Sequence, residues 1–145
     1  MISHTMLVAT CAFDGRLSAR RVASAIARGL TEGGLPEPDQ CPLELAGEVP
    51  ADVRALLDRL DFDRRMRRAR AVLVGVMLLE ERTLAGSVTF EIATRARQAG
   101  VPTYAIAARN ELSPFDARIL DLQLILEAAG PKALVAAARE LAGLV

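Results

Sequence analysis

Short apolar runs alternate along this chain with stretches whose apolar residues recur every three or four positions. The run at residues 71–75 contains no polar side chain, which is typical of a strand covered on both faces of a parallel sheet. Alternation of such strands with amphipathic helices indicates βαβ units, and hence an α/β fold. The expected strands lie at residues 6–10, 41–45, 71–75, 101–107 and 122–126.

Helices are expected between these strands. Ser18 suits the N-cap of the first helix, because its hydroxyl can accept a hydrogen bond from a free backbone N–H. Val22, Ile26 and Leu30 follow at a spacing of four, which places them on one face, and Gly33 ends the helix. The other expected helices lie at residues 51–68, with a break near 61–63, at 84–99, at 114–120 and from 131 onward.

Five strands and about five helices in 145 residues fit one domain, which we expect to span residues 1–145. The predicted architecture is a three-layer α/β/α sandwich. Right-handed crossovers restrict its topology, and we expect a five-stranded parallel, flavodoxin-like (Rossmann-like) sheet in the order 2-1-3-4-5. In such sheets ligands bind outside the carboxyl ends of the strands, so the candidate site lies in the loops after residues 10, 75 and 107.

The charges of the chain balance, with 18 basic and 18 acidic residues. This balance argues against nucleic acid or an anionic membrane as a partner, and no apolar run is long enough to span a bilayer. His4, Cys11 and Cys41 have no metal-ligand spacing, so no metal site is expected. No signal peptide is expected either, and the predicted location is the cytoplasm with reduced cysteines.

Two segments of the chain match the sequence pattern of one enzyme family. Residues 7–19, LVATCAFDGRLSA, and the following 22–30, VASAIARGL, resemble the family opening V-A-P-D-S-F-K-G-S-L-S-A and its helix E-V-A-x-A-I-A-x-G-L. Residues 72–87, VLVGVMLLEERTLAGS, and 101–106, VPTYAI, resemble V-I-T-G-E-G-R-L-D-x-Q-T-L-x-G-K and a V-P-V-I-A strand. The family is that of the type I glycerate kinases. The resemblance implies the fold of these two-lobed enzymes, which transfer phosphate from ATP to glycerate in a cleft between the lobes.

The departures from this family concern its chemistry. Asp14 stands where the family has a lysine. In the family motif G-E-G-R, the first glycine corresponds to Gly75, and Val76, Met77 and Leu78 stand at the E-G-R positions. About forty residues separate the two segments, which leaves no room for the second lobe. The resemblance therefore implies one lobe only, with degenerate catalytic motifs. ATP and Mg²⁺ are expected as cofactors only if the chain is still a kinase.

Several residues at the expected carboxyl edge are candidates for binding a small anionic ligand or phosphate. Ser18 and the amides after it could hold an anion at a helix N-terminus beside Arg16, although simple N-capping is the alternative. Glu80 falls where the family has an aspartate, so the resemblance implies a residual polar or Mg²⁺ role, although an acid that favours the dipole of the following helix is the plainer interpretation. The complete set of candidates is Cys11, Asp14, Gly15, Arg16, Ser18, Gly75, Glu80 and Thr83, with no residue assigned as catalytic.

Cys11 and Arg16 also raise the alternative of a cysteine-based phosphatase. Those enzymes use C-x5-R, in which the loop amides and the arginine hold the phosphate. Here only four residues separate Cys11 from Arg16, which spoils the loop geometry, so a buried small thiol is the plainer interpretation.

The apolar residues 76–79 fall in an expected loop that should face a cleft. Four apolar side chains there suggest burial against the domain's own loops or against a second subunit, and we expect a homodimer. The leading hypothesis is a non-catalytic glycerate-kinase-like domain that acts in ligand binding or self-association. The alternative is a phosphotransferase that acts on glycerate or a related hydroxy acid together with a partner chain.

Overall fold

The computed structural model describes residues 5–13, 15–43, 53–81 and 87–145. Its centre is a five-stranded sheet in the order β2-β1-β3-β4-β5, with every neighbouring pair parallel. The predicted fold class and strand order are confirmed. The strands are β1 (Met6–Thr10), β2 (Asp39–Pro42), β3 (Ala71–Leu79), β4 (Thr103–Asn110) and β5 (Leu122–Glu127).

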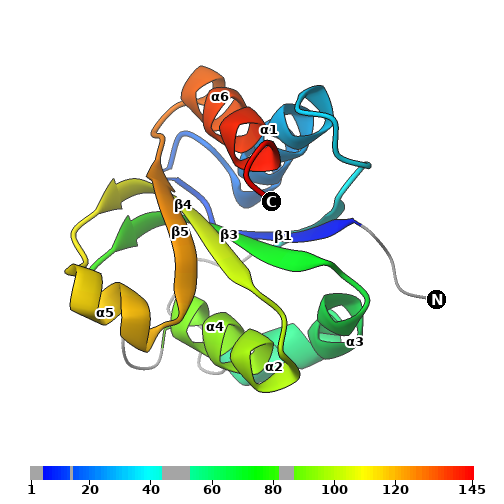
Figure 1. Ribbon diagram of the computed structural model, residues 1–145, viewed down its shortest axis with the longest axis vertical. Helices are drawn as coiled ribbons and strands as arrows, with labels where there is room; N and C mark the ends of the chain where they lie inside the picture. The colour runs from blue at the N-terminus through cyan, green and yellow to red at the C-terminus, as the bar shows by residue number, and fades with distance from the viewer. Residues whose placement is uncertain (1–4, 14, 44–52, 82–86) are drawn as a thin grey trace.

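Helices cover both faces of the sheet (Figure 1). One face carries α1 (Ala19–Glu32) and α6 (Pro131–Ala142), which lie side by side. The other carries α2 (Val53–Arg59), α3 (Phe62–Arg67) and α4 (Val88–Ala99), while the short α5 (Pro114–Ile119) lies beside β5. None of the described helices has the length and hydropathy that crossing a membrane would require.

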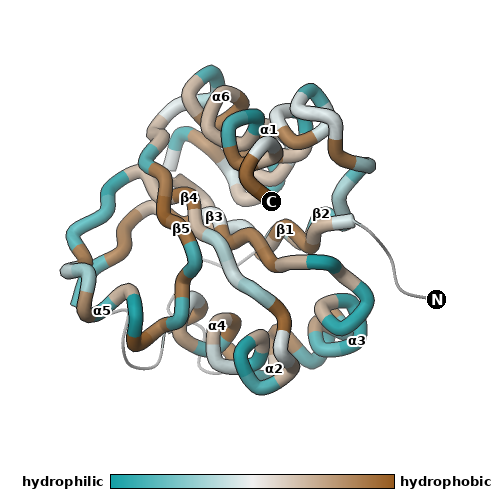
Figure 2. Tube along the Cα trace, in the orientation of Figure 1, coloured by the Kyte–Doolittle hydropathy of each residue, from teal (hydrophilic) through white to brown (hydrophobic). Residues whose placement is uncertain are grey.

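Each face of the sheet has its own apolar core. On β1, Met6 and Val8 contribute to the core under α1 and α6, whereas Leu7 and Ala9 contribute to the core under α2, α3 and α4. This alternation follows from the two-residue period of a strand. Figure 2 shows the consequence, with hydrophobic strands at the centre and hydrophilic segments on the outer sides of the helices.

The main difference from the sequence prediction is the length of β3. The strand continues through residues 76–79, which were expected to form an exposed loop. Val76 pairs with Ala107 of β4, and Leu79 is completely buried. The expectation of a loop was therefore wrong. Of the two expected kinds of burial, burial within the domain itself holds for Val76 and Leu79, whereas Met77 and Leu78 are half-buried. The homodimer stays a prediction, but it loses the observation on which it rested.

Smaller differences concern the ends of other elements. The second strand covers residues 39–42 instead of 41–45, and β4 covers 103–110 instead of 101–107. The helix expected at 51–68 is divided as anticipated, because Asp61 adopts a left-handed conformation with φ of 56° between α2 and α3.

Helices α1 and α6 pack backbone to backbone. A Cβ atom on Gly29 would lie 2.3 Å from the carbonyl oxygen of Val135, and one on Gly33 would lie 2.5 Å from the Cβ of Ala142. The two glycines are four residues apart, so both lie on the face of α1 that meets α6. Only glycine allows the two helices to approach this closely.

Candidate functional site

The connection from β1 to α1 lies at the carboxyl end of the central strands, where the sequence placed the candidate site. The backbone N–H of Cys11 donates to the carbonyl of Gly75 at 2.8 Å, which extends the pairing of β1 with β3. Phe13 and Leu17 exchange two backbone hydrogen bonds of 2.8 and 3.2 Å. These bonds close a narrow turn in which Gly15 has a positive φ of 32°.

The start of α1 is fixed by two side chains. The hydroxyl of Ser18 accepts a hydrogen bond from the backbone N–H of Arg21 at 3.2 Å, which confirms the predicted N-cap. The hydroxyl of Thr10 is buried at the end of β1 and donates to the carbonyl of Ala19 at 2.6 Å. The strand and the helix are therefore held together at the point where the loop leaves one and enters the other.

A cavity of about 380 Å³ opens beside this turn, and we call it the β1–α1 cavity. It brings together three of the predicted residues, Gly15, Arg16 and Ser18. Two guanidinium groups at a helix N-terminus create a positive potential that favours a small anion. The lining residues are Ala12, Gly15, Arg16, Leu17, Ser18 and Arg21.

Other predicted residues lie elsewhere. Gly75 is in the middle of β3 and not in a ligand loop as expected. A Cβ atom there would lie 3.0 Å from side-chain atoms of both Ile26 and Thr10, so the absence of a side chain allows α1 to pack closely against the sheet. Glu80 follows the end of β3 and is not among the residues that line the cavity. Asp14 and Thr83 lie outside the described residues.

Cys11 does not join Arg16 in a phosphate-binding loop. Its side chain packs against the core under α2, α3 and α4, whereas Leu17, next to Arg16, packs against the core under α1 and α6. Burial raises the pKa of the Cys11 thiol to about 11, so the thiol is protonated at neutral pH. A cysteine nucleophile requires the thiolate, and both observations argue against the phosphatase alternative.

The carboxyl ends of β3 and β4 form hydrogen bonds with each other and with neighbouring segments. The N–H of Glu111 donates to the carbonyl of Leu79 at 2.7 Å, and the N–H of Asn110 donates to the Glu127 carboxylate at 2.8 Å. Within the described ranges, no group of three or more His, Cys, Asp or Glu side chains is placed to hold a metal ion.

A comparison of sequences identifies the family. The sequence model of the Glycerate kinase family matches residues 43–138, which is well over half of the chain. The chain belongs to the glycerate kinase family. The match includes the second of the two segments that resemble these kinases, at residues 72–87 and 101–106, and leaves residues 7–30 outside. No curated protein matches the chain.

Two solved structures resemble this glycerate kinase family domain. Diflavin flavoprotein A3 from Nostoc sp. is 15% identical with a TM-score of 0.47, and the match covers 97% of this chain and 90% of the other. Putative glycerate kinase 2 from Salmonella typhimurium is 18% identical with a TM-score of 0.45, over 86% of this chain. The domain spans 37% of the length of that kinase.

Arg21 is the charged residue of the cavity that was not predicted from the sequence. It follows Ser18 by three positions, so the helix turn that the serine caps also places this guanidinium at the mouth of the cavity. The place of Arg21 in the first turn after the Ser18 N-cap was the available signal. It did not stand out because a basic residue on the first turn of a helix is usually read as solvent-exposed.

Proposed function

We propose that this glycerate kinase family domain is non-catalytic and binds a small anion in the β1–α1 cavity. The observation that carries the proposal is the continuation of β3 through residues 76–79. The resemblance to the kinases places the polar G-E-G-R loop at residues 75–78. In this domain the same positions are hydrogen-bonded to β4 and carry aliphatic side chains.

Phosphoryl transfer depends on cations and polar donors that are placed on the developing negative charge. Val76 is 6% exposed, so it cannot contact a nucleotide or an acceptor. Met77 and Leu78 are half-buried, but their aliphatic side chains offer neither a cation nor a polar donor. A loop of donors cannot form at these positions without breaking the pairs that Val76 and Leu78 make with β4. Loss of the lysine at position 14 removes another cation from the family pattern.

Binding of an anion, in contrast, needs only groups that the domain retains. Arg16 and Arg21 border the β1–α1 cavity, and the N-terminus of the fourteen-residue helix α1 opens beside it. The backbone of the turn is fixed by the Phe13–Leu17 bonds, so the site is largely formed before a ligand arrives. We propose inorganic phosphate or a small hydroxy acid such as glycerate as the class of ligand.

The catalytic half of the proposal is tested by measuring ADP release from ATP and Mg²⁺ with and without glycerate, beside an active kinase of the family. We expect no glycerate-dependent ADP release by this domain. Release that saturates with glycerate and is lost on boiling the protein would overturn the non-catalytic assignment.

The binding half is tested by thermal shift with inorganic phosphate and with glycerate. We expect either ligand to raise the melting temperature, and Arg16→Gln to remove the rise. Arg20→Gln is the matched control, because Arg20 is exposed on the first turn of α1 and does not line the cavity. No rise in the wild type, or an equal loss in the control, would contradict binding in this cavity.

A further inference from the structure

We propose that the groove between α1 and the start of α6 is a second ligand site, which takes a small organic anion with an apolar body. The groove has a volume of about 350 Å³, which is in the range of small-molecule sites. We call it the α1–α6 groove. It is lined by Leu17, Arg21, Ser24, Ala25, Arg28, Pro131, Lys132 and Val135.

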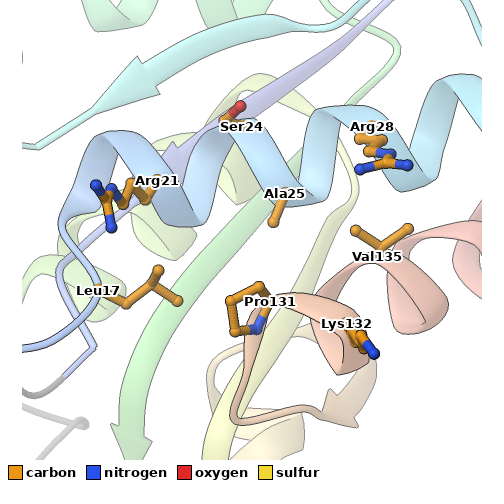
Figure 3. A pocket seen from close by; sticks show the side chains of 8 residues that line it. All are labelled: Leu17, Arg21, Ser24, Ala25, Arg28, Pro131, Lys132 and Val135. Carbon is orange, nitrogen blue, oxygen red and sulfur yellow. The ribbon is translucent and has the colours of Figure 1, made fainter.

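The residues of the groove are arranged as an apolar floor with a basic border (Figure 3). Ala25 of α1 and Pro131 and Val135 of α6 lie between the two helices. Arg21 lies toward one end of the groove, and Arg28 and Lys132 lie toward the other. A ligand with an apolar centre and an anionic group at its edge matches this arrangement.

The basic groups of the border are largely available. Within the described ranges, Arg21 and Lys132 make no ion pair, and none of the residues that line the groove is acidic. Arg28 lies 3.0 Å from the carboxylate of Glu32, but that carboxylate is also 3.6 Å from Arg139. The positive charge around the groove therefore exceeds the negative charge beside it.

The start of α6 adds to this potential. Gly130 at the N-cap provides no side chain to accept the free N–H groups, and the first turn of α6 contains no acidic residue. The positive end of the helix dipole thus faces the same region as Lys132.

A cavity on the opposite face of the sheet shows that basic residues beside a cavity do not by themselves make an anion-binding site. Asp63, Met66, Arg67 and Arg95 contribute to a cavity of about 300 Å³ between α3 and α4. There the guanidinium of Arg95 already binds Asp58, Asp63 and Glu91 at 3.0 to 3.2 Å. Arg67, the other basic residue of this cavity, shares it with the Asp63 carboxylate, whereas no acidic residue lines the α1–α6 groove.

The groove is held open by the packing of the helices that form it. Gly29 contacts the backbone of Val135 directly beyond the groove, so α1 and α6 cannot move closer together. A site that exists before binding avoids the free-energy cost of ordering its walls. An apolar floor also favours an organic anion over bare phosphate, because phosphate leaves that floor in contact with water.

The test is a two-dimensional ¹H–¹⁵N NMR titration of the full chain with phenyl phosphate, inorganic phosphate and phenol. We expect phenyl phosphate to shift the amides of Ala25, Lys132 and Val135 in a saturable manner, with inorganic phosphate and phenol at least about fivefold weaker there. Lys132→Gln should weaken phenyl phosphate about fivefold, which corresponds to the loss of about 1 kcal/mol. Arg20→Gln, the exposed neighbour outside the groove, should leave the affinity unchanged.

Several results would overturn the second site. Shifts confined to Gly15, Arg16 and Ser18 would place the ligand in the β1–α1 cavity alone. Equal weakening by Arg20→Gln and Lys132→Gln would show general electrostatic attraction, and equal binding of phenol would remove the role of the charges. Failure here leaves the proposed function intact, since Lys132 and Val135 do not line the β1–α1 cavity.

Discussion

The two faces of the sheet are packed by different means. Under α1 and α6, small residues such as Gly29 and Gly33 bring the helix backbones into contact. Under α2, α3 and α4, large side chains such as Phe62 and Met66 fill the core, and arginines connect the elements around it. Large side chains such as Ile26 and Leu30 also fill the core under α1 and α6. The difference therefore lies in how neighbouring helices meet, which is through glycines on one face and through the ion pairs of Arg95 on the other.

The two faces also differ in how some of their basic residues are engaged. On the α2–α4 face, Arg65 donates two hydrogen bonds to the Asp39 carboxylate at 2.7 and 2.9 Å and further bonds to two backbone carbonyls. Arg95 is only 12% exposed and is shared by three carboxylates. On the α1–α6 face, Arg21 and Lys132 are exposed and border a groove. On one face two partly buried arginines stabilise the fold, and on the other exposed basic groups border a groove that no acidic residue lines.

The largest expected effect comes from disturbing the backbone contact of α1 with α6. Gly33→Ala places a Cβ atom 2.5 Å from the Cβ of Ala142, so the helices must separate. We expect the free energy of unfolding to fall by about 2–3 kcal/mol, as for other overpacked cores. Urea unfolding followed by circular dichroism measures the change.

Gly143→Ala is the matched control for this substitution. Gly33 and Gly143 are both C-caps in the right-handed helical conformation, with φ of −81° and −76°. The nearest atom to a Cβ on Gly143 is 3.5 Å away, which is an ordinary contact. A loss of stability as large as that of Gly33→Ala would mean that glycine at a helix end, and not the helix contact, is what matters.

A smaller effect is expected from removing an arginine on the opposite face. Arg95→Met keeps the aliphatic contacts and leaves Asp58, Asp63 and Glu91 without their shared cation. We expect a loss of about 1–1.5 kcal/mol, because two of the three carboxylates are well exposed and the interaction is partly screened. Urea unfolding at low and at 1 M salt measures it, and the difference from wild type should shrink at high salt.

Arg97→Met on the same helix serves as the control for Arg95→Met. Arg97 is exposed, and its one hydrogen bond to the part of the chain that the structure describes is a long one, of 3.3 Å to the carbonyl of Ile119. Its substitution should change stability by no more than about 0.5 kcal/mol. Equal effects of the two substitutions would show that the three carboxylates contribute nothing specific.

The smallest expected effect concerns the buried thiol under the α2–α4 helices. Burial raises the pKa of Cys11 from 9.0 to about 11, so folding favours the protonated thiol. This contribution is complete below pH 9 and is lost as the pH rises from 9 toward 11. Between pH 8 and pH 10 the wild type should lose about 1 kcal/mol more stability than Cys11→Ala.

Urea unfolding of both proteins at the two pH values measures the Cys11 contribution, because every other titrating group is common to them. Identical pH dependence in wild type and Cys11→Ala would contradict the burial of this thiol. Rapid alkylation of Cys11 by iodoacetamide at pH 7 would contradict it independently.

Periodicity predicted most of the fold. Apolar runs and helix spacing located all five strands, and the right-handed crossover of βαβ units restricted the strand order. The error at residues 76–79 has a specific cause: the run from Ala71 to Leu79 is apolar throughout, which by itself predicts one long strand. The resemblance to the kinases suggested a loop after Gly75, and the structure follows the side chains and not the resemblance.

The site was less predictable because it depends on contacts between distant segments. Ser18 was identified from its own neighbourhood, since an N-cap is a local feature. The α1–α6 groove joins residues near position 25 with residues near position 132, and no periodicity connects them. Gly33 was expected only to end the first helix, and nothing was inferred from Gly29, so the close approach of α6 was not predicted.

The pairing of α1 with α6 has a consequence for synthesis of the protein. The two helices come from opposite ends of the described chain, so α1 emerges from the ribosome long before its partner. Until α6 is translated, the Gly29 face of α1 and the strands beneath it stay uncovered. A nascent chain stalled ahead of Pro131 would present that apolar surface to chaperones and proteases, and co-translational folding of this face must end late.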